Sequence, residues 1–255
     1  MGNNRILFFA VLLISLLAVV GCKTKGGDSC SCGDKKALVG PTGKAKNQKT
    51  PGSLDNKGVP SVGQSDAAAV LKIIHRRKSV RHYLSRPVPT MWLEKLVRAG
   101  MAAPTAVNKQ PWAFIIITER KTLDALGDKL PYAKMIKQTP AAIIVAGDLE
   151  KALPGKMLEF WIQDVSAAVE NILLAAEAMG LGAVWTGVYP MEKQLGVVTT
   201  LLSLPKHIIP LAVIPIGWPK GDDVPKNKWD AAKLHWEKWG QNNKPSLISP
   251  ALPEK

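Results

Sequence analysis

The segment from Phe160 to Met179 constrains the fold of this chain more than any other stretch. Its apolar residues recur at steps of three and four, the period of an α-helix, and they are Trp161, Val165, Ala168, Val169, Ile172, Leu173 and Ala176. Gly180 and Gly182 follow directly, as glycines commonly do where a helix ends. The alanines in this pattern are small, so another helix can approach closely. The segment therefore predicts the longest helix of the chain.

Two shorter helices and four strands are predicted around it. One helix spans Ala67–Arg77, with Val70, Leu71 and Ile74 on one face, and the other spans Met91–Met101. Short apolar runs predict strands at Ala113–Thr118, Ala141–Ala146, Ala183–Val188 and Leu211–Ile216. Helices and strands mix without strict alternation, so an α+β fold is favoured over a doubly wound sheet.

Residues 1–21 have the pattern of a secretion signal. Arg5 precedes Ile6–Val20, an apolar run that is short for a membrane-spanning helix and typical of a signal peptide. The run leads into VVGC, which resembles a bacterial lipobox, although Val19 stands where leucine is commoner. By that resemblance Cys22 is the lipidated residue, and its acyl chains anchor the protein to a membrane of the cell envelope. An ordinary signal peptide with a chance cysteine is the alternative.

Residues 22–66 are predicted to be the lipidated cysteine and a flexible linker. Gly, Lys, Ser, Asn, Asp and Pro dominate the stretch, and it has too few large apolar residues to bury a core. The globular domain is then expected at 67–240, with a tail at 241–255. Cys30 and Cys32 could form a disulfide or bind a metal, but they lack further ligands nearby. We expect a linker feature without catalytic work, and no metal site.

The formal charge of +14 invites a nucleic-acid interpretation. However, the lysines are scattered through the linker, the helical segments and the tail, and no basic stripe with interleaved aromatic residues is present. An anionic lipid, a phosphate-bearing cofactor or simple solubility explains such charge equally well. We therefore expect no nucleic-acid partner.

The densest basic motif is HRRKSVRHY, from His75 to Tyr83. Its clustered cations repel each other, so an anion should offset them. The guanidinium groups of Arg77 and Arg81 have the geometry that suits phosphate, and Ser79 adds a hydroxyl. The alternative is a solvated basic helix end that complements its own dipole.

A second motif, APTAVNKQPWAF at 103–114, carries more polar chemistry than a turn between a helix and a strand requires. The four histidines lack metal-like spacing, and no nucleophile–base motif is visible. Whatever chemistry the chain performs is therefore expected to come from a bound cofactor.

RRKSVRHY and APTAVNKQPWAF are followed by the Ala-rich helix that ends in MGLGAVWTGVYP, and then by IPIGWP with lysines downstream. In this order, the motifs resemble the nitroreductase family of FMN-dependent oxidoreductases, from about Ile73 to Trp229. The resemblance implies an intertwined homodimer built around a mainly antiparallel central sheet flanked by helices. It also implies two FMN molecules at the dimer interface, each contacted by both subunits.

The resemblance further implies which residues contact FMN. Arg77, Lys78, Ser79 and Arg81 match the first basic segment, with Lys78 acting partly through its backbone and Arg81 near the pyrimidine edge. Pro104, Thr105 and Asn108 match the loop that the partner subunit lays against the flavin, whereas Gln110 and Trp112 are expected to fix that loop. Thr186 and Gly187 match positions near the reactive ring, and Lys226 and Lys228 match the basic pair on the phosphate. Thr105 stands where serine is common. Lys228 replaces a frequent arginine and so loses a bidentate contact.

As an enzyme of this kind, the chain is expected to reduce small organic acceptors, such as nitroaromatics or quinones, with electrons from NAD(P)H in a ping-pong cycle. No catalytic side chain is expected, because the flavin carries the chemistry. The physiological donor could instead be a membrane redox partner, since NAD(P)H is scarce outside the cytoplasm. The alternative function is a lipoprotein that binds a flavin or another flat ligand without turnover.

Overall fold

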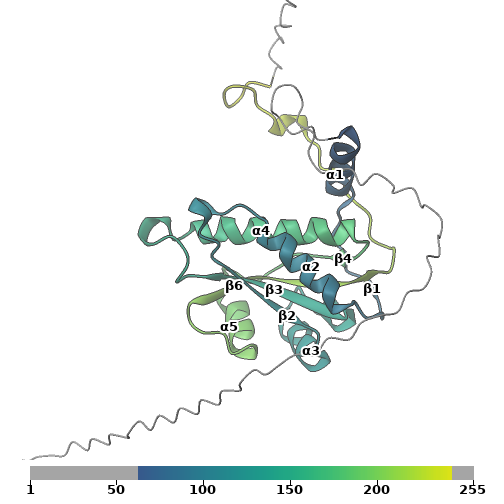
Figure 1. Cartoon of the computed structure of the whole chain (residues 1–255), viewed down its shortest axis with the longest axis vertical. Helices are drawn as coiled ribbons and strands as arrows, with labels where there is room; N and C mark the ends of the chain where they lie inside the picture. Colours follow the sequence, from purple (N-terminus) through teal and green to yellow (C-terminus); the bar gives the residue numbers. More distant parts are fainter. Residues whose placement is uncertain (1–62, 243–255) are drawn as a thin grey trace, which may run out of the picture. The chain divides into compact units, whose positions relative to one another are not determined.

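In the computed structural model of the chain, residues 63–242 are described (Figure 1). The predicted signal peptide, Cys22, most of the linker and most of the tail lie outside the described residues. The elements in chain order are α1 (Gln64–Arg76), β1 (Tyr83–Leu84), α2 (Thr90–Met101), η1 (Ala106–Asn108), β2 (Trp112–Ile117), α3 (Arg120–Lys129), η2 (Lys134–Gln138), β3 (Ala141–Asp148), η3 (Gly155–Met157), α4 (Phe160–Ala178), β4 (Gly182–Ala183), β5 (Thr186–Gly187), α5 (Glu192–Leu201), β6 (Ile208–Pro219) and η4 (Ala231–Lys233).

An antiparallel sheet organises these elements. Its strand order is β1-β6-β3-β2, and the short strands β4 and β5 also pair with β6. The central strand β6 contains Pro210 and Pro215, although proline cannot donate to a β-ladder. Pro210 lies beside the register shift between Val145 and Ala146, and a bulge is one place where a strand tolerates proline. The antiparallel α+β architecture expected from the sequence is confirmed.

Helices cover the sheet on both faces, with α2 and α4 on one side and α3 and α5 on the other (Figure 1). The position of strand β3 between the two helical layers explains why apolar and polar residues do not alternate in its sequence. Ile143 and Val145 belong to the core under α4, whereas Ala142 and Ile144 belong to the core under α3 and α5. Because successive side chains of a strand point to opposite faces, a strand buried on both faces must be apolar throughout.

The long helix α4 begins and ends within one residue of its predicted bounds. All the residues of its predicted apolar pattern are buried, and they pack against the sheet and α2. One contact explains a glycine at the sheet surface: a Cβ on Gly147 of β3 would lie 2.3 Å from the Trp161 ring.

The prediction of a single strand at 183–188 was wrong. The segment forms two short strands, since β4 pairs with Gly217 and Ile216 and β5 with Val213 and Ala212. Val184 and Trp185 lie in the gap between them, opposite a stretch of β6 that includes Pro215. Proline has no N–H to offer a neighbouring strand, which accounts for the break.

Helix α1 was predicted with a shared apolar face, and that face is largely exposed within the chain. Val70, Leu71 and Ile74 keep 59%, 55% and 45% of their surface accessible. No helix among residues 63–242 is both long enough and apolar enough to cross a membrane.

Candidate functional site at the end of the first helix

The backbone of the basic segment 77–81 is held by the sheet. Helix α1 ends at Arg76, and Arg77 adopts an extended conformation. Val80 is buried, and its N–H donates to the Ala183 carbonyl at 3.0 Å. Gly182 allows this approach, because a Cβ there would lie 2.9 Å from the Cβ of Val80. This anchor leaves the side chains on either side of Val80 free to line a site.

A cavity of ≈ 400 Å³ lies beside this segment and joins the two basic regions of the sequence. Arg77, Lys78, Ser79 and Arg81 line it from one side. The other side comes from the segment after β6, which supplies Lys226 and Lys228 together with Asp222, Asp223 and Val224. Six residues predicted to bind the cofactor therefore meet around one cavity, although they lie far apart in the sequence.

The repulsion expected among the clustered cations is relieved in part by the protein itself. Arg77 Nε lies 3.1 Å from Glu170 Oε1, and Lys78 Nζ lies 3.0 Å from Glu177 Oε2. Both acids belong to α4, and neither was expected at the site. A sequence signal did exist, because the two acids lie two helical turns apart in a helix that is otherwise mostly apolar.

A second cavity, of ≈ 360 Å³, has Arg81 in its lining as well. Thr186 and Gly187, both predicted to lie near the reactive ring, line it. The remaining lining residues are apolar or aromatic, and the sequence did not single them out for a flavin site: Tyr132, Met135, Val184, Trp185 and Met191. Because Arg81 borders both cavities, one basic and one mostly apolar compartment lie side by side.

Thr186 is buried, and its hydroxyl donates to the Val213 carbonyl of β6. Its hydroxyl proton is therefore committed to the sheet, and the oxygen retains only its acceptor capacity.

Asp223 brings negative charge to the basic compartment. Its Oδ2 accepts a hydrogen bond from the Arg81 N–H at 3.0 Å and lies 3.7 Å from His82 Nδ1. Burial raises the pKa of the Tyr83 hydroxyl far above its ordinary value, and the charge of Asp223 raises it further, against the opposing effect of Arg81. Tyr83 is therefore a neutral donor, and its hydroxyl reaches the Val80 carbonyl at 2.7 Å.

The predicted loop residues Pro104, Thr105 and Asn108 do not line these two cavities. They belong instead to an exposed loop with a strained backbone. Val107, Asn108 and Gln110 in this loop have φ angles of 51°, 54° and 51°. A β-branched residue such as Val107 rarely adopts this conformation, and such strain concentrates at functional sites. Val107 is also 80% exposed.

Internal hydrogen bonds hold this loop in shape. The Gln110 N–H donates to Thr105 Oγ1 at 3.0 Å, and Gln110 Nε2 donates to Asn108 Oδ1 at 2.9 Å. At its base, the Ala106 N–H donates to Asp164 Oδ1 on α4 at 2.8 Å. The expectation that Gln110 fixes the loop agrees with these contacts.

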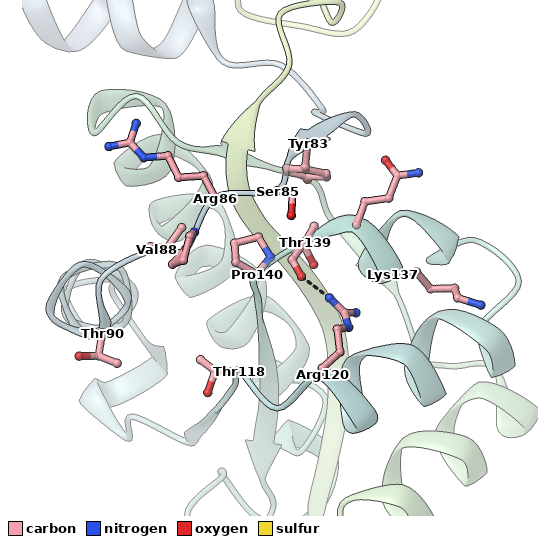
Figure 2. Close-up of a pocket in the computed structure, with 12 residues that line it drawn as sticks. Tyr83, Ser85, Arg86, Val88, Thr90, Thr118, Arg120, Lys137, Thr139 and Pro140 are labelled. Atoms are coloured by element: carbon pink, nitrogen blue, oxygen red, sulfur yellow. Dashed lines mark hydrogen bonds between the residues drawn. The ribbon is translucent and has the colours of Figure 1, made fainter.

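A larger cavity of ≈ 770 Å³ contains none of the predicted site residues (Figure 2). Arg86, Arg120 and Lys137 make it basic, but each already has a partner in the protein, and the Arg86 guanidinium lies 4.1 Å from the centre of the Trp218 ring. Arg120 donates to the carbonyls of Thr139 and Ile136, and Lys137 pairs with Asp128. In Figure 2, Lys137 points away from the cavity and Arg120 toward Thr139. Volume alone therefore does not make this the functional site.

Asp148, Glu150 and His207 bring potential metal ligands within 4.8 Å of one another, a grouping that the sequence did not reveal. Contacts within the protein account for this grouping. Lys151 Nζ lies 2.9 Å from Asp148 Oδ2, and His207 Nδ1 lies 3.4 Å from Glu150 Oε1. Burial alone would raise the pKa of Asp148, but Lys151 and the Glu150 N–H outweigh burial and hold it below its ordinary value.

Comparisons with known proteins agree with the fold and with the family that the motifs resemble. The family model described as "Nitroreductase family" matches residues 74–131 and 126–218. A candidate NADH dehydrogenase/NAD(P)H nitroreductase from Methanothermobacter thermautotrophicus is 44% identical over 179 residues, covering 69% of this chain and 91% of that protein.

Solved structures give the same result. The crystal structure of a candidate NADH dehydrogenase/NAD(P)H nitroreductase from Parabacteroides distasonis has a TM-score of 0.64 and 49% identity, and the match covers 67% of this chain and 98% of that one. A candidate nitroreductase from Desulfovibrio desulfuricans in complex with FMN has a TM-score of 0.57 and 30% identity, with 67% and 97% covered. The chain therefore belongs to the nitroreductase family.

Proposed function

We propose that the chain is an FMN-dependent oxidoreductase that uses NAD(P)H to reduce a small organic acceptor, as a homodimer held at a membrane by a lipid anchor on Cys22. The observation that carries the proposal is the convergence of Arg77, Lys226 and Lys228 on one cavity. Three cations from two distant segments suit a phosphate dianion. The neighbouring apolar cavity suits a flat ring.

The chemistry of the two cavities fits FMN in both of its parts. Arg77, Lys226 and Lys228 would hold the phosphate, and Arg81, at the border of the two cavities, would face the pyrimidine edge of the ring. Thr186 and Gly187 would lie along the ring, with Trp185 and Met135 on the apolar wall. When bound, FMN supplies a ring that accepts two electrons and releases them again. A cation such as Arg81 stabilises negative charge on that ring and so favours its reduced form.

A flavin ring held in the apolar cavity would offer one exposed face to donor and acceptor. An NAD(P)H molecule and a planar acceptor would visit it in turn, which is the basis of a ping-pong cycle. Relatives named "Oxygen-insensitive NADPH nitroreductase" and "FMN reductase [NAD(P)H]" support a nicotinamide donor. Nitroaromatics and quinones are the proposed acceptors, because both are flat and take up electrons together with protons.

The exposed face of α1 supports a homodimer. An apolar groove of ≈ 310 Å³ runs between α1 and α4, and its lining consists of Ala69, Val70, Ile73, Ile74, Leu174, Ala175 and Ala178. Exposed apolar surface of this kind marks an interaction site, and the small alanines permit close helix packing. A second copy of the chain would cover this face and bring the strained loop at 104–108 to the partner's flavin.

The lipid anchor rests on the sequence, since Cys22 lies outside the described residues. A lipid-anchored envelope protein meets little NAD(P)H outside the cytoplasm, so a membrane redox partner is the alternative donor. Metabolic labelling with a fatty acid tests the anchor: the wild-type chain should incorporate label, and Cys22→Ser should not. Equal labelling of the two would remove Cys22 from the proposal.

The catalytic proposal is tested with the purified full chain under anaerobic conditions. The flavin absorbance should disappear when NADH or NADPH is added and return when a nitroaromatic or quinone follows. A chain that retains FMN but passes electrons to neither class of acceptor, even after chemical reduction of the flavin, would instead be a non-catalytic flavin-binding lipoprotein.

A further inference from the structure

Three consecutive cations, Arg76 at the end of α1 and the two residues that follow it, divide between two acids of α4. Glu177 receives Lys78 and Arg76, with Nζ and Nε at 3.0 Å and 3.6 Å from its carboxylate oxygens, whereas Glu170 receives Arg77, the residue between them. The two acids are seven residues apart, so they share one face of α4. The basic motif is therefore fastened to the helix at two points.

These two points differ in burial. The side chain of Glu177 is only 7% exposed and that of Lys78 is 19% exposed, whereas Glu170 is 46% exposed. A buried carboxylate needs a charged partner, because desolvation of an unpaired charge is costly. Glu177 therefore commits the Lys78 ammonium to the protein, while Arg77 is paired with an acid that remains accessible to solvent.

We propose that Glu177 is a positioning residue that holds the Lys78 side chain on α4 and thereby sets the course of segment 77–81 along the cofactor cavity. The inference rests on the proposed FMN function and refines it. The Lys78 ammonium does not bind the phosphate, and Lys78 serves the site only through its backbone. Arg77, Lys226 and Lys228 then neutralise the charge of the phosphate.

Riboflavin, which is FMN without its phosphate, separates the two roles. A residue that contacts the phosphate affects FMN binding more than riboflavin binding, whereas a residue that positions the segment affects both equally. We would measure the dissociation constants of both flavins for Glu177→Gln, Lys78→Met and the double variant, with Arg77→Gln as the reference for a phosphate contact. The full chain is used at a temperature where circular dichroism shows each variant folded.

Glu177→Gln and Lys78→Met should each weaken FMN and riboflavin by the same factor, about tenfold, a typical size for coupled charged neighbours. The double variant should bind FMN at least as tightly as the single variant that has the lower FMN affinity. The reason is that the double variant leaves no unpaired charge in the buried site. Arg77→Gln should instead lower the preference for FMN over riboflavin by about tenfold or more, as expected for a lost charge-assisted hydrogen bond.

Three results would overturn the inference. They are a Lys78→Met variant that loses FMN preference as Arg77→Gln does, a Glu177→Gln variant with unchanged affinity for both flavins, and single effects that multiply in the double variant. A wild-type chain that binds neither flavin is a distinct outcome, which defeats the proposed function itself and with it this refinement.

Discussion

The individual residues of the site do two kinds of work. Arg77, Lys226 and Lys228 present charge to a cavity, whereas Val80 and Tyr83 hold the backbone that carries Arg77 and Arg81. Within one subunit, the strained loop at 104–108 neither lines the two cavities nor holds the backbone of the basic segment. Its side chains at Thr105 and Asn108 accept hydrogen bonds from Gln110, just beyond the loop, which is consistent with a role that the second subunit completes.

Asn108 tests that role at the level of one side chain. Asn108→Gly removes the side chain but permits the φ of 54°, so the backbone is not strained by the change. FMN retention should fall by about tenfold, the loss expected for one or two hydrogen bonds. Equilibrium dialysis measures the loss, circular dichroism checks the fold, and the exposed neighbour Lys109→Gln serves as control. Unchanged retention would remove Asn108 from the site.

Asp148 predicts a pH dependence of stability. Its folded pKa lies below the ordinary value of 3.8, so its contribution is present above that value and is lost as the pH falls through the folded pKa. Asp148→Asn should therefore lower the melting temperature at neutral pH, and the difference should shrink below about pH 4. Asp128→Asn, at an exposed acid, provides the comparison. A difference that stays constant down to strongly acidic pH would contradict this account.

At the scale of elements, the site depends on how closely the segment after the first helix approaches the sheet. The segment after α1 reaches β4 only because Gly182 has no side chain. Helix α4 then supplies Glu170 and Glu177 at its C-terminal half, and the chain after β6 returns with the lysines. The segment after α1 and the chain after β6 thus line the basic cavity, and α4 supplies the acids that pair with Arg77 and Lys78.

Gly182→Ala should disturb this convergence. The added Cβ would lie 2.6 Å from Val80 Cγ1, so segment 77–81 must shift. We expect about 1–3 kcal/mol less unfolding free energy, as for other overpacked sites, and weaker FMN binding. Gly196→Ala in α5 is the matched control, because its Cβ would meet nothing within 4 Å. Alanine there should stabilise the helix by about 1 kcal/mol. Denaturant titration compares the two, and similar losses in both would contradict the argument.

The elements that the sequence predicted well are those with strong patterns. Helix α4 and strand β3 carry long apolar patterns and were predicted to within about two residues at each end. Helices α3 and α5 were missed because each is only ten residues long and buries few side chains, so its apolar pattern is short. The segment 183–188 was predicted as a single strand, because its apolar residues do not reveal that Pro215 lies opposite.

The site residues that lie in sequence motifs were predicted, and those outside the motifs were missed. The basic and C-terminal residues were identified through the order of the motifs, and the structure brings them together. Glu177, Asp223 and Met135 were missed, because their roles depend on contacts between elements that a single sequence does not display. The roles of Pro104, Thr105 and Asn108 remain predictions, since they require a second subunit.

For the whole molecule, the exposed apolar face of α1 is the feature that a single chain leaves unexplained. Leu71 and Ile74 lie on a helix that contacts the rest of the chain mainly through α4. Burying this face in a homodimer would offset the cost of its exposure to water. It would also complete two equivalent flavin sites.

A double variant, Leu71→Asp with Ile74→Asp, should prevent this association. Charges on the apolar face cannot be buried without partners, so the dimer should dissociate. Analytical ultracentrifugation should show a dimer for the wild-type chain and a monomer with weak FMN retention for the variant. Lys72→Asp, at an exposed position of the same helix, should stay dimeric. A wild-type monomer with full FMN binding would contradict the proposed assembly.

The most direct test of the central claim is the visible absorbance spectrum of the purified full chain after incubation with FMN and removal of the unbound flavin. We predict a yellow protein that retains about one FMN per protomer, because the basic and apolar cavities together match both parts of that molecule. A colourless protein that retains no FMN would contradict the account.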